Sequence, residues 1–421
     1  MSSATGAPAT ATESVLQAPA RQAGRLYHDL LSSRETQEIR ERVRRFADDL
    51  VAPAAGRIAT GDEVDDGFPA DIFEAMAREG LFEIAFPSQA GGLGLDRPAS
   101  ATAAAIEELA YYSNSVAAIY DVHCVLAGTG LNQGSPEQRR RWLGPLIRGE
   151  IVGAFATSEP GSSSDLSPQS VQTVGTRTGA GWRLNGRKRW ITNAPAADVI
   201  LVLARTGDRL SMFIVPSTAP GVSIGRADRK LGNKGQLTAD VILDDVELPE
   251  SARLGPEGGG LKIALSMLTY GRIAIAAAGV GMAQAAFDHM TDRLKTREAF
   301  GGKLGRMQHW QFLMADRALQ LESARSLYIK AALLLDQGNL FPEPEAAMAK
   351  IAGTSLAVDI ARDAVQLFGG LGFTQELGAD GTTGPVEAIY RDSKVTEIYE
   401  GANEIQKWII ARHLLGREVA G

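Results

Sequence analysis

A carboxylate stands beside a glycine in the segment Ile398-Tyr399-Glu400-Gly401-Ala402-Asn403-Glu404-Ile405-Gln406, just before a helix that we predict over residues 403–415. A glycine lets the backbone turn and approach a ligand without a Cβ clash, and the helix behind it keeps the turn rigid. This arrangement suits Glu400 as a general base. For an isolated glutamate, a first-turn carboxylate favoured by the helix dipole is the simpler interpretation, so the base hypothesis depends on other segments.

Two polar loops flank a predicted hairpin in the middle of the chain. Residues 156–165 have the sequence ATSEPGSSSD, and residues 189–193 have the sequence RWITN. Taken singly, the first is an ordinary Ser- and Gly-containing turn, and Trp190 is a core aromatic.

Two further segments could contact a phosphate or a nucleotide. Residues 297–301 have the sequence REAFG with Gln308 following, and residues 366–372 have the sequence QLFGGLG. An arginine can contact phosphate in bidentate fashion, and glycines admit a ligand to the backbone. A solvated helix-end cation and a glycine C-cap are the alternatives.

Together and in this order, the four segments and the Glu400 segment resemble the acyl-CoA dehydrogenase family over residues 33–416, with Ala402 where the family usually has Thr. The resemblance implies a flavoprotein oxidoreductase that uses FAD to convert an acyl thioester, an acyl-CoA, to its 2,3-enoyl form. It implies that Ser158 donates to the pyrimidine edge of the flavin, that Thr192 reaches N5 and that Trp190 packs against the ring. Fixed neutral donors of this kind stabilise negative charge on a reduced flavin.

The resemblance also assigns the dinucleotide end of FAD. It implies that the pyrophosphate and adenosine parts contact Arg297, Phe300, Gln308, Gln366, Gly369 and Gly370. In the family these groups reach FAD held mainly by a neighbouring subunit, which implies a homotetramer. An electron acceptor such as an electron-transfer flavoprotein is the implied partner. No Gly-x-Gly-x-x-Gly follows a predicted strand near the start of the chain, so a Rossmann flavin site is not expected.

The reaction needs a base for the α-proton, and flavin N5 would accept the β-hydride. Some family members place the base on the first bundle helix, directly before an Arg. Here Gly271 precedes Arg272, so Glu400 is the consistent candidate. Arg272 would contact the pantetheine or phosphate part of the thioester, with a bundle salt bridge as the alternative. Ser164 and Gly401 are the other predicted substrate contacts.

Apolar spacing predicts the elements that position these residues. Helical spacing begins after Ser33, a predicted N-cap, and short β-rich runs follow from about residue 151, with a turn at Asn185-Gly186. The predicted helices span residues 70–79, 100–113, 116–130, 261–296, 308–337, 344–368 and 403–415. We predict an α+β fold with a flexible tail (1–24), an N-terminal helical domain (25–150), a β domain of barrel or sandwich type that carries the flavin loops (151–255) and a C-terminal four-helix bundle (256–421).

Composition narrows the class of protein. The 421 residues carry a net charge of −7 and no long basic segment, which argues against a nucleic-acid partner. The apolar stretch 261–290 is interrupted by polar side chains, so we predict a buried bundle helix and no membrane partner. Cys124 is the one cysteine, which excludes an internal disulfide and favours the cytoplasm. Helix 116–126 is predicted to line the acyl pocket with Tyr120, His123 and Cys124, and no metal is expected.

The sequence is compatible with three alternative functions. Thr269 stands where many CoA-using members have Asp, and residues 377–384 form an insertion, so the acyl group could be tethered to a carrier protein in a biosynthetic pathway. A flavin monooxygenase of the same fold is a second alternative, which the carboxylate of Glu400 disfavours. A non-catalytic acyl-thioester-binding protein is a third. The acyl length and branching do not follow from the sequence.

Overall fold

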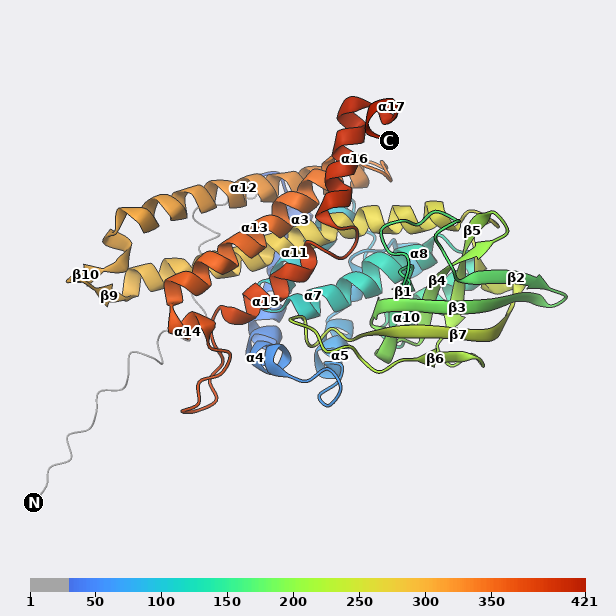
Figure 1. Cartoon of the computed structure of the whole chain (residues 1–421), viewed down its shortest axis with the longest axis horizontal. Helices are drawn as coiled ribbons and strands as arrows, with labels where there is room; N and C mark the ends of the chain where they lie inside the picture. The colour runs from blue at the N-terminus through green and yellow to red at the C-terminus, as the bar shows by residue number, and fades with distance from the viewer. Residues whose placement is uncertain (1–29) are drawn as a thin grey trace, which may run out of the picture.

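The computed structural model describes residues 30–421, so the predicted flexible tail at 1–24 lies outside the described residues. Figure 1 shows helices of the N-terminal part beside long C-terminal helices, with the strands of the middle part gathered at one end of the molecule and a short two-stranded hairpin at the other. The predicted α+β class and the order helices, strands, helices are confirmed.

The N-terminal part begins with a capped helix, as predicted. The Ser33 side chain accepts a hydrogen bond from the backbone N–H of Thr36 and starts α3. Its buried face, which includes Ile39, Val43 and Phe46, packs against α6. The helices of this part are α3 (Arg34–Phe46), α4 (Ala52–Thr60), α5 (Ala70–Arg78), α6 (Pro98–Ala110), α7 (Asn114–Tyr120), α8 (Thr129–Asn132), α9 (Pro136–Gln138) and α10 (Gly144–Ile147).

The helix predicted over residues 116–130 is not uniform. It begins as α7, continues as a π-helical segment Asp121–Gly128 and ends as α8. The whole π-helical segment is buried. π-Helical turns are rare and often occur at functional sites, and apolar spacing alone does not distinguish them from an α-helix. The buried π-helical segment is therefore a candidate part of the active site.

The β domain is an eight-stranded sheet in the order β6-β7-β3-β2-β4-β5-β8, with β1 pairing in parallel to β4. Its own core includes Trp182, Phe213 and Val246, separate from the helical core. The strands are β1 (Gly153–Ala156), β2 (Val174–Thr178), β3 (Gly181–Thr192), β4 (Val199–Thr206), β5 (Arg209–Pro216), β6 (Val222–Ile224), β7 (Thr238–Pro249) and β8 (Arg253–Leu254).

The predicted turn at Asn185-Gly186 is wrong. Strand β3 runs straight through both residues and pairs with β7, with a register shift between Leu184 and Gly186. A Cβ at Gly186 would lie 2.6 Å from the Thr173 hydroxyl, so the glycine here allows a close approach within a bulge. Asn-Gly favours hairpin turns, but the same dipeptide also fits a bulge, and pairing with β7 decides between them.

Three long helices dominate the C-terminal part: α11 (Gly260–Thr296), α12 (Gln308–Asp336) and α13 (Glu345–Phe368). Helix α11 is long and apolar enough to span a membrane, but 83% of its most apolar window is buried in the protein. Helices α11 and α13 approach closely, since a Cβ at Gly279 would lie 2.6 Å from the backbone of Gly353. The remaining elements are β9 (Glu298–Ala299), β10 (Gly302–Lys303), α14 (Gly370–Phe373), α15 (Glu387–Thr396), α16 (Asn403–Leu415) and α17 (Arg417–Ala420).

The predicted fourth bundle helix is present as α16, but it projects away from the other three (Figure 1). Its buried residues are Asn403 and Gln406. Helix α6 instead packs along α11 and α12. Trp408, Leu414 and Leu415 on α16 remain exposed to solvent.

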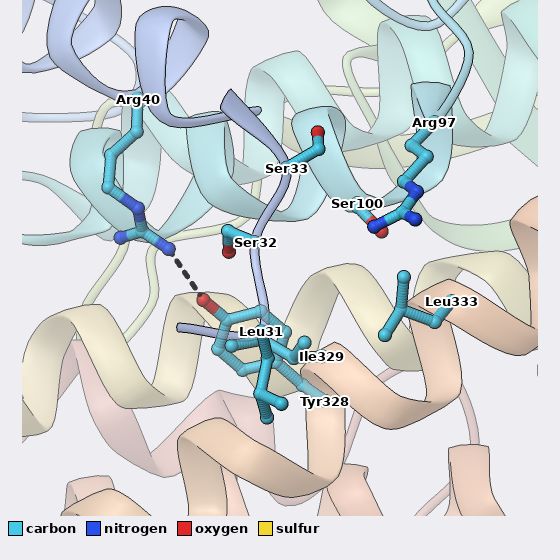
Figure 2. A pocket seen from close by; sticks show the side chains of 9 residues that line it. All are labelled: Leu31, Ser32, Ser33, Arg40, Arg97, Ser100, Tyr328, Ile329 and Leu333. Atoms are coloured by element: carbon cyan, nitrogen blue, oxygen red, sulfur yellow. Dashed lines mark hydrogen bonds between the residues drawn. The ribbon is translucent and has the colours of Figure 1, made fainter. Parts of the chain in front are cut away.

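A buried charge cluster joins the N-terminal helices to the bundle. The Arg325 guanidinium donates to Glu107 at 2.9 Å, and Arg40 donates to the Tyr328 hydroxyl at 2.9 Å. Figure 2 shows the second contact beside a small cavity between α3, α6 and α12. Two neighbouring arginines hold the pKa of Glu107 down to about 2 against the opposing effect of its burial.

Candidate active site

Glu400 lies in the turn between α15 and α16 with an unusual backbone conformation. Its φ is 53° and that of Gly401 is 93°, so two successive residues adopt the left-handed region. A glutamate there is uncommon, and such conformations cluster at functional sites. Gln406, one turn into α16, donates to the Gly401 carbonyl at 2.9 Å and closes the turn.

Asn403 fixes the Glu400 turn to helix α13. Its side-chain oxygen accepts from the Lys350 ammonium at 2.9 Å, and its amide nitrogen donates to the Thr354 hydroxyl at 3.1 Å. Its backbone N–H donates to the Glu397 carbonyl at 3.0 Å. The turn is therefore positioned by buried hydrogen bonds to the bundle.

The Glu400 carboxylate occupies space that a side chain at Gly271 would fill. A Cβ at Gly271 would lie 1.8 Å from Glu400 Oε2 and 3.1 Å from Cδ2 of Leu126. The two positions that the sequence offers for a base thus converge on one point in space. Glycine on α11 leaves room there for the carboxylate from the C-terminal turn.

The surroundings of Glu400 are low in polarity but not neutral. Burial raises the pKa of Glu400, while Asp121 as a hydrogen-bond partner and the cations Lys350 and Arg272 lower it in part. Burial also lowers the pKa of Lys350 to about 8. A carboxylate whose pKa lies above its usual range is a better base for a weak carbon acid.

Asp121 and Lys350 were not predicted as site residues. Asp121 is the first residue of the π-helical segment and is 1% exposed, and Lys350 is fully buried on α13. A signal existed in both cases, because a single charged residue interrupts an otherwise apolar stretch. Such residues are almost never fully buried without a partner.

Two of the residues predicted to contact the flavin ring, Trp190 and Thr192, lie at the end of strand β3. Trp190 has a φ of 57° at a register shift between Lys188 and Ile191, and its side chain is 51% exposed. Trp190 is therefore not a core aromatic. The Ser158 carbonyl accepts from the backbone N–H of Arg189 at 2.9 Å, so Ser158, Trp190 and Thr192 lie on neighbouring segments.

Gln236 orients the Thr192 hydroxyl. Its amide nitrogen donates to Thr192 Oγ1 at 2.6 Å and to Thr238 Oγ1 at 3.0 Å, while Asn233 donates to its amide oxygen at 3.4 Å. Because Thr192 accepts from Gln236, its own hydrogen remains free to donate to a further acceptor. Gln236 was not predicted, since nothing in the local sequence shows which side chain reaches Thr192.

The same polar chain reaches the Glu400 turn. Asn114 donates to Asn233 at 3.0 Å, and the Tyr399 hydroxyl lies against Asn114. The backbone N–H of Asn233 also donates to the side-chain carboxyl of Asp392 on α15 at 2.7 Å. The end of β3 and the segment that carries Glu400 are thus parts of one polar network.

A buried ion pair holds the loop that carries Ser158. The Lys188 ammonium contacts Glu159 at 2.7 Å and the Thr157 carbonyl at 3.1 Å. Glu159 also accepts the backbone N–H of Thr173 at 2.9 Å. Lys188 and Glu159 are almost completely buried, and their satisfied hydrogen bonds meet the requirement for burying a charge pair.

The predicted substrate contacts differ in their environments. Arg272 is 7% exposed and forms an ion pair with Glu343 at 2.5 Å, which is the bundle salt bridge named as an alternative. Its role toward a thioester stays a prediction. Ser164 lies exposed in the loop after β1, and Gly401 adjoins Glu400.

The predicted dinucleotide contacts lie far from the end of β3. Arg297, Phe300 and Gln308 are exposed at the tip where α11 meets α12, next to β9 and β10 (Figure 1). Gln366, Gly369 and Gly370 are exposed at the end of α13, and a Cβ at either glycine would meet no atom within 4 Å. Along α11 the axial separation between Gly271 and Arg297 is about 39 Å. One chain therefore does not bring all predicted cofactor contacts together.

His123 has a structural role. Gly153 donates its backbone N–H to His123 Nδ1 at 3.2 Å, so Nε2 carries the hydrogen and donates to the Leu146 carbonyl at 3.0 Å. Burial lowers the pKa of His123 to about 3. Tyr120 donates to the Leu81 carbonyl, and Cys124 is buried and free.

The residues at the end of β3 fit a flavin. An exposed indole, a hydroxyl with a free hydrogen and a half-buried serine meet at the edge of the β domain, on a network that continues to the Glu400 turn. An aromatic face and fixed neutral donors are the groups that a flavin ring needs. Among residues 30–421, no group of three His, Cys, Asp or Glu side chains could hold a metal ion.

Comparison with known families matches the chain in three consecutive parts. The acyl-CoA dehydrogenase N-terminal domain matches residues 33–150, the middle domain 154–246 and the C-terminal domain 258–415. The mitochondrial short-chain specific acyl-CoA dehydrogenase of Homo sapiens is 39% identical over 401 residues, covering 94% of this chain and 93% of the relative.

Solved structures give the same result. Butyryl-CoA dehydrogenase from Megasphaera elsdenii superposes with a TM-score of 0.84 at 32% identity, covering 91% of this chain and 99% of the other. A glutaryl-CoA dehydrogenase from Mycobacterium smegmatis in complex with FADH2 superposes with a TM-score of 0.84 at 27% identity, covering 93% and 97%.

Proposed function

Because this chain belongs to the acyl-CoA dehydrogenase family, we propose that it oxidises an acyl-CoA to the 2,3-enoyl-CoA with Glu400 as the base that removes the α-proton. The protein is an acyl-CoA dehydrogenase, and its cofactor is FAD. The observation that carries the role of Glu400 is its carboxylate, which fills the space above Gly271.

The residues around Glu400 prepare it for proton abstraction. The Asn403 contacts hold the turn, the left-handed backbone aims the side chain at α11, and burial raises the pKa of the carboxyl. Bound FAD supplies a hydride acceptor for the β-carbon. Ser158, Trp190 and Thr192 would hold its ring, and the Thr192 hydroxyl could donate to it because Thr192 Oγ1 accepts from Gln236.

A short acyl chain is our proposed substrate class. The support is the name of the human relative, which is specific for short chains. Arg272 would contact the thioester arm, as its position directly after Gly271 favours. Burial raises the pKa of its partner Glu343, while Arg272 lowers it in part.

A carrier-protein substrate is less favoured by the position of the insertion. Within residues 377–384, the Thr383 side chain lies against Gly56 of α4. They follow the C-terminal end of α13, whereas the Arg272–Glu343 pair lies at its N-terminal end, about 36 Å away along the helix. The insertion is thus remote from the residue proposed to contact the thioester arm.

Two other functions make different predictions. A flavin monooxygenase would not need the buried carboxylate at Glu400, and a thioester-binding protein would not need the Thr192–Gln236 contact. The presence of both features supports dehydrogenation.

A homotetramer forms part of the proposal. The separation of Arg297 from Gly271 exceeds the length of an extended dinucleotide, so the tip of α11 would serve FAD held by another subunit. The exposed apolar side chains of α16, Trp408, Leu414 and Leu415, would be covered by such an assembly. We further propose an electron-transfer flavoprotein as acceptor and the cytoplasm as location.

The test is anaerobic titration of the purified FAD-loaded protein with acyl-CoA thioesters of increasing length and with the same acyl groups on a carrier protein. We expect bleaching of the flavin absorbance, fastest with short acyl-CoA. Glu400→Gln should retain flavin but bleach about 10²–10⁴-fold more slowly. A wild-type protein that no thioester bleaches would contradict the proposal, and faster reduction by carrier-bound acyl groups would overturn the choice of CoA.

A further inference from the structure

Asp121 presents a buried carboxyl group that no donor in the described chain satisfies. The residue is 1% exposed, and neither of its oxygens receives a hydrogen bond from an N–H or O–H group of residues 30–421. The group that faces it is the carboxyl of Glu400, whose Oε2 is also buried and without a donor. Two carboxyls from distant parts of the sequence therefore form a pair.

Electrostatics limits the protonation states of such a pair. Two ionised carboxylates in contact repel each other, and each has acceptors but no hydrogen to donate. In a buried site this arrangement is costly, whereas a single shared proton turns the repulsion into a charge-assisted hydrogen bond. At least one of the two groups therefore holds a proton in the resting protein.

The neighbouring charges favour one negative charge on the Glu400 side. The cations Lys350 and Arg272 act on Glu400, while Asp121 is affected by burial and by Glu400. The other titratable neighbours are Tyr120 and Cys124 from the same segment, Tyr270 from α11 and Tyr399 from the Glu400 turn. Burial raises the pKa of each of these four, so they stay neutral at pH 7.

We propose that Asp121 is a positioning residue that holds a proton and donates it in a hydrogen bond to the Glu400 carboxylate, so that the pair carries one negative charge on the base. The inference rests on the proposed role of Glu400. During the reaction the α-C–H bond breaks, its proton forms an O–H bond with Glu400, and a hydride leaves the β-carbon for the cofactor. The pair then holds two protons and no charge, and Asp121 keeps its own proton throughout.

The pH dependence of flavin reduction tests this proposal in two variants of the holoenzyme. Asp121→Asn still offers an N–H donor to Glu400, so we expect its rate-against-pH profile to match the wild type. Asp121→Leu removes the donor, so the apparent pKa of the base should rise by about 1–2 units. If Asp121 were ionised, both variants would lower that pKa. If neither variant moved it, Asp121 would have no positioning role.

A second measurement needs neither substrate nor turnover. Infrared spectra of the resting holoenzyme at neutral pH should contain the C=O stretch of a protonated carboxyl that is absent from Asp121→Asn. Identical spectra would overturn the proposal even if Asp121→Leu failed to fold. Because the spectra are recorded without a thioester, they also separate a failure of this inference from a failure of the proposed reaction.

Discussion

Gly271→Ala should disable the base without harming the fold. The new Cβ would lie 1.8 Å from Glu400 Oε2, whereas ordinary contacts begin at 3.4 Å, so the oxygen must retreat by about 1.6 Å. A misplacement of about 1 Å at a reacting group can lower a rate by about 10²-fold. We therefore expect flavin reduction at least about 10²-fold slower than in the wild type, measured by anaerobic stopped-flow absorbance at saturating acyl-CoA.

Stability should not follow activity in this variant. Position 271 lies inside α11, where alanine is favoured over glycine by up to about 1 kcal/mol. Gly279→Ala is the matched control on the same helix, because its Cβ would meet the backbone of Gly353 at 2.6 Å. The first variant should lose activity with a melting temperature no lower than that of the wild type, and the second should melt at a lower temperature than the wild type.

A double-mutant cycle gives the refutation. Once Glu400→Gln has removed the base, adding Gly271→Ala should cost little more, since both changes act on one group. If the two effects multiplied, or if Gly271→Ala alone reduced its flavin at the wild-type rate, the carboxylate would not depend on the space above Gly271.

Three further predictions concern other residues. Gln236→Leu should slow flavin reduction about tenfold, because Thr192 loses the donor that orients its hydroxyl; stopped-flow rates equal to the wild type would contradict this. Lys350→Met should raise the apparent pKa of the base in the rate profile, since a cation that lowers the pKa of Glu400 is lost; an unchanged profile would exclude that role. The pKa of Glu107 is about 2, below its usual 4.5, so the stability it contributes is present above pH 4.5 and lost as pH falls toward 2. Acid unfolding followed by circular dichroism should show this loss in the wild type and not in Glu107→Gln, and equal pH dependence would refute it.

The helical parts of the fold were predictable because their signals are local. Ser33 caps its helix as expected, and the long apolar helices begin and end within one or two residues of their predicted bounds. Local signals fail where tertiary contacts choose between two uses of the same residues. Asn185-Gly186 fits a turn or a bulge, and only pairing with β7 selects the bulge.

The catalytic base could be predicted from the sequence because the reaction requires a carboxylate and few positions offer one. Glu400 stood out as the carboxylate before a glycine, and the space above Gly271 agrees with that choice. Asp121 and Gln236 act through partners more than 40 residues away in sequence. Since no short-range spacing encodes such contacts, the three-dimensional structure was needed to find them.

Because the tip of α11 lies far from the end of β3, flavin binding should depend on protein concentration. If the exposed residues at the tip complete a cofactor site on another subunit, FAD binds the assembled protein more tightly than the single chain. Mass action then requires that FAD strengthen assembly to the same degree. Dilution of the loaded protein should release subunits and flavin over the same concentration range, and excess FAD should shift that range downward.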